Sequence, residues 1–205
     1  TSPDLRHQLI SNNIKSISNV FFTHFHADQT HGINDLRIFF LINKKQIPVF
    51  ADKKTYKYLN STFKYCFKSN SQYPSTLSLN PIKNKNIIIN KKKKLTINAI
   101  TVKHGDVDSI CYIINKKLAY ASDISSIYKK DLNSFKNLNF FVVDCLRFKF
   151  HPSHFNLEQV IKLIKIVKPK KTILTNMHSD LDYKKLKDIL PKNIVPAYDG
   201  MTLTL

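Results

Sequence analysis

The sequence lacks several features that would indicate other classes of protein. Its three cysteines, Cys66, Cys111 and Cys145, are odd in number and widely spaced, which argues against a disulfide framework and against paired zinc ligands. We therefore expect a reducing, cytoplasmic setting. No apolar run approaches the roughly 20 residues of a membrane-spanning helix, and no charged-then-apolar signal segment opens the chain. We expect no membrane association.

Glycine is also scarce, with three residues in the chain against an ordinary usage of about 7 per cent. Each glycine directly follows a polar residue of interest: Gly32 follows a histidine, Gly105 follows His104, and Gly200 follows Asp199. These placements indicate backbone geometry that requires glycine.

Arginine and acidic residues are few, so lysine dominates a formal net charge of +19. Such a charge would suit the phosphates of a nucleic acid. However, lysine is abundant together with asparagine and isoleucine, all encoded by A/T-rich codons, so genome bias can supply much of the charge. The run Lys91–Lys94 is better read as a solvated hairpin tip than as a binding site. Nucleic acid stays open as a partner but is not favoured.

No segment rich in proline, glycine or serine divides the chain, and residues 1–205 are predicted to form one domain. The sequence enters at Thr1 as if in mid-domain, so we expect it to be N-terminally incomplete. Periodicity predicts helices over residues 3–12 and 33–42, the second mostly buried. Asp52 and Asn156 are expected N-caps, with Gln159 completing a capping box, and residues 70–81 are expected to form a loop.

The chemistry is concentrated in residues 23–32. Directly behind the apolar run 20–22, this stretch carries His24, His26, Asp28 and His31. Histidine nitrogens and carboxylate oxygens suit zinc, manganese or iron. The alternative is that these are polar side chains of a surface turn.

Further candidate ligands follow predicted strands elsewhere in the chain. The strands at 95–103, 118–122, 140–143 and 172–174 are followed by His104, Asp123, Asp144 and His178, respectively. Rigid strand ends can direct several side chains to one point. A lone histidine is more often structural, but the repetition of ligand types at strand ends favours a site.

This order of residues resembles the metallo-β-lactamase superfamily of metal-dependent hydrolases. The matching features are the His-x-His-x-Asp run at His24, the distant His104, Asp123 and the final His178. The resemblance implies an α/β (α+β) fold, a four-layer αββα sandwich that here lacks its first N-terminal strands. Within the superfamily the chain is most similar to the phosphoribosyl 1,2-cyclic phosphate phosphodiesterase-like group, which is related to transfer-RNA 3′ processing nucleases.

The resemblance also implies a ligand set for two divalent metal ions, with zinc as first choice and manganese or iron as alternatives. The first ion would take His24, His26 and His104, the second Asp28 and His178, with Asp123 bridging them. Gln29 stands where the family usually has a histidine, and an amide oxygen is a weaker ligand than imidazole. The second site is therefore in question. Gln29 could ligate weakly, orient a water or only fill the gap. His31 could replace it as a ligand, but a structural or outer role is favoured.

The implied activity is that of a phosphodiesterase acting on a small cyclic phosphate or nucleotide-like phosphodiester, with a hydroxide held by the metals attacking phosphorus. His154 would protonate the leaving group, with His151 as a competitor, while Asp28 and Asp123 would act through the metals. The remaining assignments are Asp144 as a residue that orients a ligand histidine or caps a strand end, and Arg37, Arg147 and Asp199 as substrate-binding candidates. The alternatives are an RNA-processing nuclease of the same fold and a metal-binding protein with little catalysis. A homodimer is left open.

Overall fold

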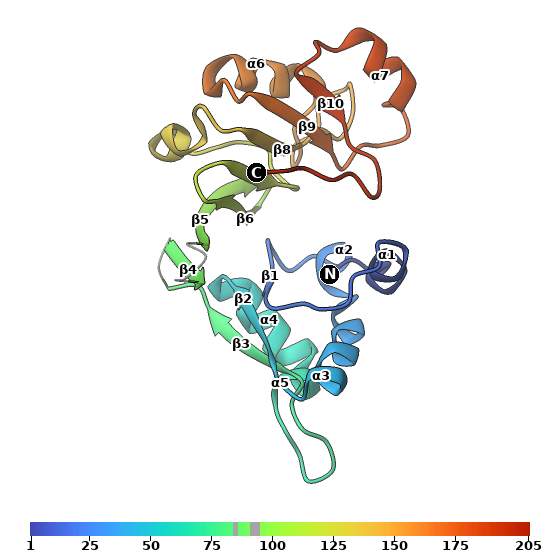
Figure 1. Cartoon of the computed structure of the whole chain (residues 1–205). Coiled ribbons are helices and arrows are strands. Elements are labelled where there is room, and N and C mark those ends of the chain that lie inside the picture. Colours follow the sequence, from blue (N-terminus) through green and yellow to red (C-terminus); the bar gives the residue numbers. More distant parts are fainter. Residues whose placement is uncertain (84–85, 91–94) are drawn as a thin grey trace. The chain divides into compact units, whose positions relative to one another are not determined.

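The computed structural model describes residues 1–83, 86–90 and 95–205 (Figure 1). Its internal contacts divide the chain into two compact units, Thr1–Lys83 and Asn84–Leu205, called here the N-terminal and C-terminal units. Within the described ranges, no helix is both long and apolar enough to span a membrane. The expected hairpin tip at Lys91–Lys94 lies outside the described residues.

The N-terminal unit contains a small parallel sheet. Strand β2 (Ile47–Ala51) pairs on one side with β1 (Val20–Phe21) and on the other with β3 (Leu77–Pro81). Residues alternate along β2, so that Ile47, Val49 and Ala51 are buried and the two residues between them are partly exposed. Figure 1 shows the helices of this unit beside the sheet. They are α1 (Leu5–Ser11), α2 (Ala27–Thr30), the 3₁₀ helix η1 (Ile33–Leu36), α3 (Arg37–Asn43), α4 (Lys53–Thr62) and α5 (Lys64–Phe67).

The helix boundaries in this unit follow local sequence signals. The carboxylate of Asp52 accepts the backbone N–H groups of Lys54 and Thr55, at 3.1 Å in each case, and so begins α4 as expected. The expected helix over residues 33–42 is present as η1 and α3, but the prediction that it is mostly buried is wrong. Ile38 and Ile42 are 51% and 64% exposed, because only the opposite side of α3 reaches the core.

The C-terminal unit contains a seven-stranded sheet in the order β10-β9-β8-β7-β6-β5-β4. Neighbouring strands from β4 to β7 are antiparallel, and those from β7 to β10 are parallel. The strands are β4 (Asn86–Asn90), β5 (Leu95–His104), β6 (Val107–Ile114), β7 (Leu118–Ala121), β8 (Phe140–Asp144), β9 (Lys171–Thr175) and β10 (Ile194–Pro196). The helices are the 3₁₀ helix η2 (Lys129–Phe135), α6 (Leu157–Val167) and α7 (Tyr183–Ile189).

A large apolar core holds this unit together. The core includes Phe135 and Phe141, both fully buried, with rings 5.8 Å apart between centroids. Helix α6 joins the core through one apolar face and begins with the predicted capping box, in which Asn156 and Gln159 exchange hydrogen bonds of 2.9 Å. Two sheets and several helices make this a mixed α/β protein, as the sequence predicts.

The topology brings the ends of several strands to one edge of the larger sheet. Strands β7, β8 and β9 are parallel neighbours, and β5 has the same direction as β7 because β6 is antiparallel to both. The C-terminal ends of these four strands therefore share one edge. His104 and Asp144 are the last residues of β5 and β8, and Asp123 and His178 follow β7 and β9 by two and three residues.

Candidate metal centre

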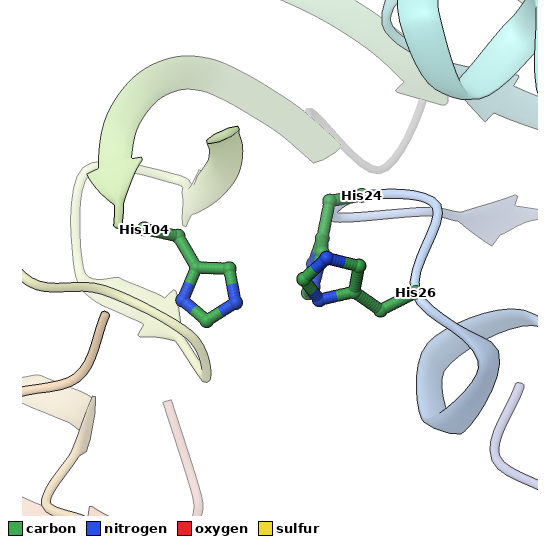
Figure 2. A group of neighbouring side chains, drawn as sticks. All are labelled: His24, His26 and His104. Atoms are coloured by element: carbon green, nitrogen blue, oxygen red, sulfur yellow. The ribbon is translucent and has the colours of Figure 1, made fainter. Parts of the chain in front are cut away.

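In the N-terminal unit, two histidines of the motif turn their rings toward each other in the segment that follows β1. Figure 2 shows His24 and His26 with adjacent rings, whose centroids lie 4.5 Å apart in an edge-to-face arrangement. His24 Nε2 lies 3.0 Å from His26 Nδ1, and His24 Nδ1 lies 3.1 Å from the hydroxyl of Thr23. His24 is fully buried. Two imidazole nitrogens thus converge on one point, as ligands of a single cation would.

The other polar residues of this motif lie in and after α2. The amide of Gln29 donates to Asp28 Oδ2 at 2.9 Å, so the unusual glutamine contacts the candidate carboxylate ligand directly. His31 Nε2 lies 3.1 Å from the Tyr58 hydroxyl, and its ring packs edge-on against Phe63 at 5.6 Å. These contacts suit the outer role predicted for His31.

In the C-terminal unit, His104, drawn in Figure 2, is the last residue of β5. The backbone holds its ring in one tautomer. Its Nδ1 lies 2.8 Å from the carbonyl oxygen of Ser153. Because a carbonyl can only accept, Nδ1 must carry the proton, which leaves a lone pair on Nε2. The close approach depends on the next residue. Gly105 has φ +58°, and a Cβ built there would lie 2.4 Å from Ser153 Oγ.

His154 is oriented in the same way, but by a carboxylate. Its Nδ1 lies 2.6 Å from Asp144 Oδ2, and Asp144 also accepts the backbone N–H of Ile124 at 3.1 Å. Asp144 is fully buried while the His154 side chain is 16% exposed. Burial raises the pKa of Asp144 to about 6, although its bonds to His154 and Ile124 act in the opposite direction. Asp144 therefore orients His154, which is not one of the ligand histidines predicted from the sequence.

Asp123 belongs to one group of side chains with His104 and His154, and it contacts the amide of Asn176, a residue to which the sequence assigned no role. Its Oδ2 accepts the Ser122 hydroxyl at 2.8 Å. The Asn176 Nδ2 group lies 3.4 Å from Asp123 Oδ1, 3.5 Å from Asp144 Oδ1 and 3.3 Å from the Ser122 carbonyl. Asn176 has a φ of +59°, a left-handed conformation that asparagine tolerates better than most residues. It therefore links two carboxylates of the site.

One potential ligand atom from each of His104, Asp123 and His154 lies within 4.8 Å of the other two. His104 and Asp123 are buried and His154 is partly exposed, so the group is both fixed and reachable. Two imidazoles and one carboxylate match the donor preference of zinc and related divalent ions. The residues present in this unit therefore fit a divalent metal.

Other predicted site residues lie outside this group. His178 is exposed, and its Nδ1 lies 3.2 Å from Asp180 Oδ1. The guanidinium of Arg147 donates to the carbonyl oxygens of Lys149 at 3.3 Å and Phe150 at 2.8 Å. These hydrogen bonds stay within the loop that contains Arg147. His151 accepts the Ser153 N–H at 3.2 Å through Nδ1.

The chain matches a known family over most of its length. The family profile described as "Beta-lactamase superfamily domain" matches residues 1–177. The chain belongs to the metallo-β-lactamase superfamily. The predicted resemblance and fold class are thereby confirmed.

Individual relatives agree with this family. A solved structure titled as a new diphosphatase from the PhnP family is similar with a TM-score of 0.90 and 28% identity, over 100% of this chain and 78% of that one. The short form of human tRNase Z is similar with a TM-score of 0.72 at 13% identity, over 99% and 85% of the two chains. A protein of Porphyromonas gingivalis (strain ATCC BAA-308 / W83) named octanoyltransferase is 29% identical over 203 residues. The match covers 98% of this chain but only 40% of the length of that relative.

For a member of this superfamily, the site residues that sequence reasoning missed are those that position the ligands. Ser153 acts through its carbonyl oxygen, which every residue type has, so no sequence signal could have shown it. Asn176 did carry a signal, since it directly follows β9 at the same sheet edge as Asp123 and Asp144. Thr23 and Ser122 stand next to His24 and Asp123 in the chain, where a hydroxyl can reach its neighbour.

Proposed function

We propose that this chain is a metal-dependent phosphodiesterase acting on a small cyclic phosphate or nucleotide-like phosphodiester. The observation that carries the proposal is the group His104, Asp123 and His154 at one sheet edge, with buried Asp144 behind it. In this arrangement two metal-type donors, His104 and Asp123, lie beside the imidazole of His154, which is oriented by the carboxylate of Asp144. Hydrolysis of a phosphodiester needs both an electrophilic centre and a proton donor.

The proposed metal ligands are those that the family resemblance implies, namely His24, His26, Asp28, His104, Asp123 and His178. Gln29 contacts Asp28 among them. A bound divalent ion would polarise a phosphoryl oxygen and lower the pKa of water, as zinc does in many hydrolases. Zinc is the proposed ion because the donors are mainly imidazole. The exposed position of His178 and the amide at Gln29 favour weaker binding at the second site.

His154 is proposed as the group that protonates the leaving alkoxide. With Nδ1–H directed to Asp144, its Nε2 is the atom left to deliver a proton, and the adjacent carboxylate stabilises the imidazolium form. His151 suits this role less well. Partial burial, with the nearby His154 and Arg147 charges, lowers the pKa of His151, so less of it is protonated at neutral pH.

A cavity of about 450 Å³ in the C-terminal unit is proposed to hold the organic part of the substrate. It is lined by Asn176, Met177, Tyr198 and Asp199, among others. Asn176 connects this cavity to Asp123 and Asp144. Tyr198, 57% exposed, offers a ring on which a base or sugar could stack. Asp199 therefore remains a substrate-binding candidate.

The comparisons support the phosphorus chemistry to different degrees. The diphosphatase of the PhnP family is similar over the whole chain and carries the most weight. The tRNase Z likeness supports the fold alone, and an RNA nuclease is the alternative that the net charge of +19 keeps open. The octanoyltransferase relative extends well beyond this chain, which covers 40% of it, so its name supports no acyl-transfer proposal here.

The proposal is tested with purified protein, its metal content and bis(4-nitrophenyl) phosphate. We expect bound divalent metal, hydrolysis that is lost on treatment with a chelator and restored by Zn²⁺ or Mn²⁺, and loss of at least about 100-fold in kcat/KM for His26→Ala. His7→Ala, a change of an exposed histidine in α1, is the matched control. Metal binding without turnover would contradict the enzymatic proposal, and cleavage of an RNA oligomer without cleavage of small esters would favour the nuclease.

The role of His154 has its own test. A 4-nitrophenolate leaves readily without a proton, whereas an unactivated alkoxide needs one. His154→Ala should therefore reduce hydrolysis of an alkyl phosphodiester more than that of bis(4-nitrophenyl) phosphate, by about 10²-fold or more. Equal losses on both substrates would indicate that His154 binds metal or substrate instead.

A further inference from the structure

The N-terminal unit contains a cavity that holds none of the candidate metal ligands, although one of the predicted substrate-binding candidates, Arg37, lines it. Its volume is about 490 Å³, within the range of about 300–1,000 Å³ that is typical of small-molecule sites. All of its lining residues belong to this unit and none of them is a candidate metal ligand. They include Asn34, Arg37, Phe40, Tyr65, Asn70 and Tyr73.

One wall of the cavity is the loop between α5 and β3, and hydrogen bonds hold this loop in shape. Asn70 Oδ1 accepts the N–H groups of Gln72 at 2.9 Å and Tyr73 at 2.8 Å. Further along, Ser75 N–H donates to Ser69 Oγ at 2.9 Å, which ties the two ends of the loop together. The loop is therefore organised before any ligand arrives, so binding would cost little ordering entropy.

The polar groups of the cavity favour an anion. Arg37 is the only charged side chain among the described lining residues, and no carboxylate lines the cavity. Arg37 is exposed at the start of α3, where its guanidinium is accessible to solvent and to a ligand. Asn34 Oδ1 accepts the Tyr65 hydroxyl, which leaves the Asn34 amide N–H₂ group as a further donor. A guanidinium with nearby N–H donors suits phosphate or carboxylate oxygens.

The apolar part of the cavity favours a flat ring. Three aromatic side chains, Phe40, Tyr65 and Tyr73, line it. Tyr65 and Tyr73 are 60% and 59% exposed, an unusual amount of aromatic surface for two rings beside one cavity. A planar ligand could cover these faces by stacking.

We propose that this cavity, with Arg37 at its rim and Tyr65 and Tyr73 on its walls, binds a planar aromatic ring that carries an anionic group. A nucleoside monophosphate is the ligand class that combines both features. None of the lining residues is a candidate metal ligand, so the proposal is for a second ligand, distinct from the phosphodiester that the metals would hold.

The test uses the absence of tryptophan from the sequence. Tyr73→Trp places a single tryptophan at the cavity, and its fluorescence is followed during titration with adenosine 5′-monophosphate. We expect a saturable change. Inorganic phosphate lacks the aromatic ring and adenosine lacks the anionic group. Each should bind at least about tenfold more weakly than adenosine 5′-monophosphate. Tyr120→Trp places the tryptophan on β7 in the C-terminal unit instead and serves as the control. Its fluorescence should not follow the titration curve that Tyr73→Trp gives with adenosine 5′-monophosphate.

Two variants in the Tyr73→Trp background locate the binding. Arg37→Gln should weaken binding of the monophosphate by about tenfold or more, whereas Lys64→Gln, a change of an exposed cation outside the lining, should change it less than about twofold. Asp123→Asn in the presence of a chelator should leave the signal unchanged. Three results would each overturn the proposal. The first is the absence of a saturable signal, and the second is equal binding after Arg37→Gln in protein whose melting curve is unaltered. The third is loss of the signal in Asp123→Asn.

Discussion

Asp144 gives the sharpest prediction, because it is a fully buried carboxylate whose pKa is raised to about 6. In the unfolded chain its pKa returns to about the ordinary value of 3.8. Between these two pH values the folded state keeps a proton that the unfolded state releases. The contribution of Asp144 to the free energy of unfolding is therefore complete below about pH 4 and is lost as pH rises through about 6.

The expected size of this effect follows from the same two pKa values. The interval from 3.8 to about 6 corresponds to about 3 kcal/mol. The variant Asp144→Asn keeps the shape of the side chain but cannot ionise. We therefore predict that the stability of Asp144→Asn relative to the parent rises by about 3 kcal/mol between pH 4 and pH 7.

The measurement is urea denaturation of both proteins, freed of metal by a chelator, at pH 4, 5, 6 and 7. Taking the difference between variant and parent cancels the titration of the shared groups that do not interact with Asp144. Asp188→Asn, which removes an exposed carboxylate from α7, should give a difference that changes little with pH. A flat difference for Asp144→Asn, or one that falls with pH, would refute the reasoning.

Two further predictions concern the geometry and the metal count. Gly105→Ala should lower the free energy of unfolding by about 1–3 kcal/mol in thermal denaturation, since Gly105 has φ +58° and the new Cβ would lie 2.4 Å from Ser153 Oγ. Adding Ser153→Gly should restore part of this loss, and an unaffected single variant would contradict the close approach. Gln29→His should tighten binding of a second Zn²⁺ in calorimetric titration, because imidazole is a better zinc ligand than an amide. Unchanged affinity and stoichiometry would mean that position 29 is not a ligand position.

The sequence predicted the fold through features that depend on local patterns. The capping residues Asp52 and Asn156 begin their helices as expected. Strands β5 and β8 end at His104 and Asp144, and Asp123 follows the end of β7 by two residues. The exposure of α3 was not predictable in this way. An apolar run shows that a helix can be buried, but not how much of its surface the rest of the chain covers.

The candidate site was predictable to the extent that it is made of ligand-type side chains at strand ends. His104 and Asp123 come together because β5 and β7 run in the same direction and end at one edge of the sheet, and the segment between β8 and α6 adds His154. The contact between His104 and the Ser153 carbonyl joins residues 49 positions apart through a backbone atom. Side-chain identity carries no information about such a bond, so the tautomer of His104 could be derived only from the structure.

Asp144 connects the stability and the proposed function of the C-terminal unit. The buried, ionised carboxylate of Asp144 lowers the stability of the metal-free fold. The same charge accepts the Nδ1–H of His154, with 2.6 Å between Nδ1 and Asp144 Oδ2, and favours the imidazolium form of His154. Asp144→Asn should therefore raise stability at neutral pH and lower phosphodiester hydrolysis together. A carboxylate kept for packing alone would give the first effect without the second. Opposite changes in the two quantities are what distinguish a residue that positions a proton donor from one that only fills a core.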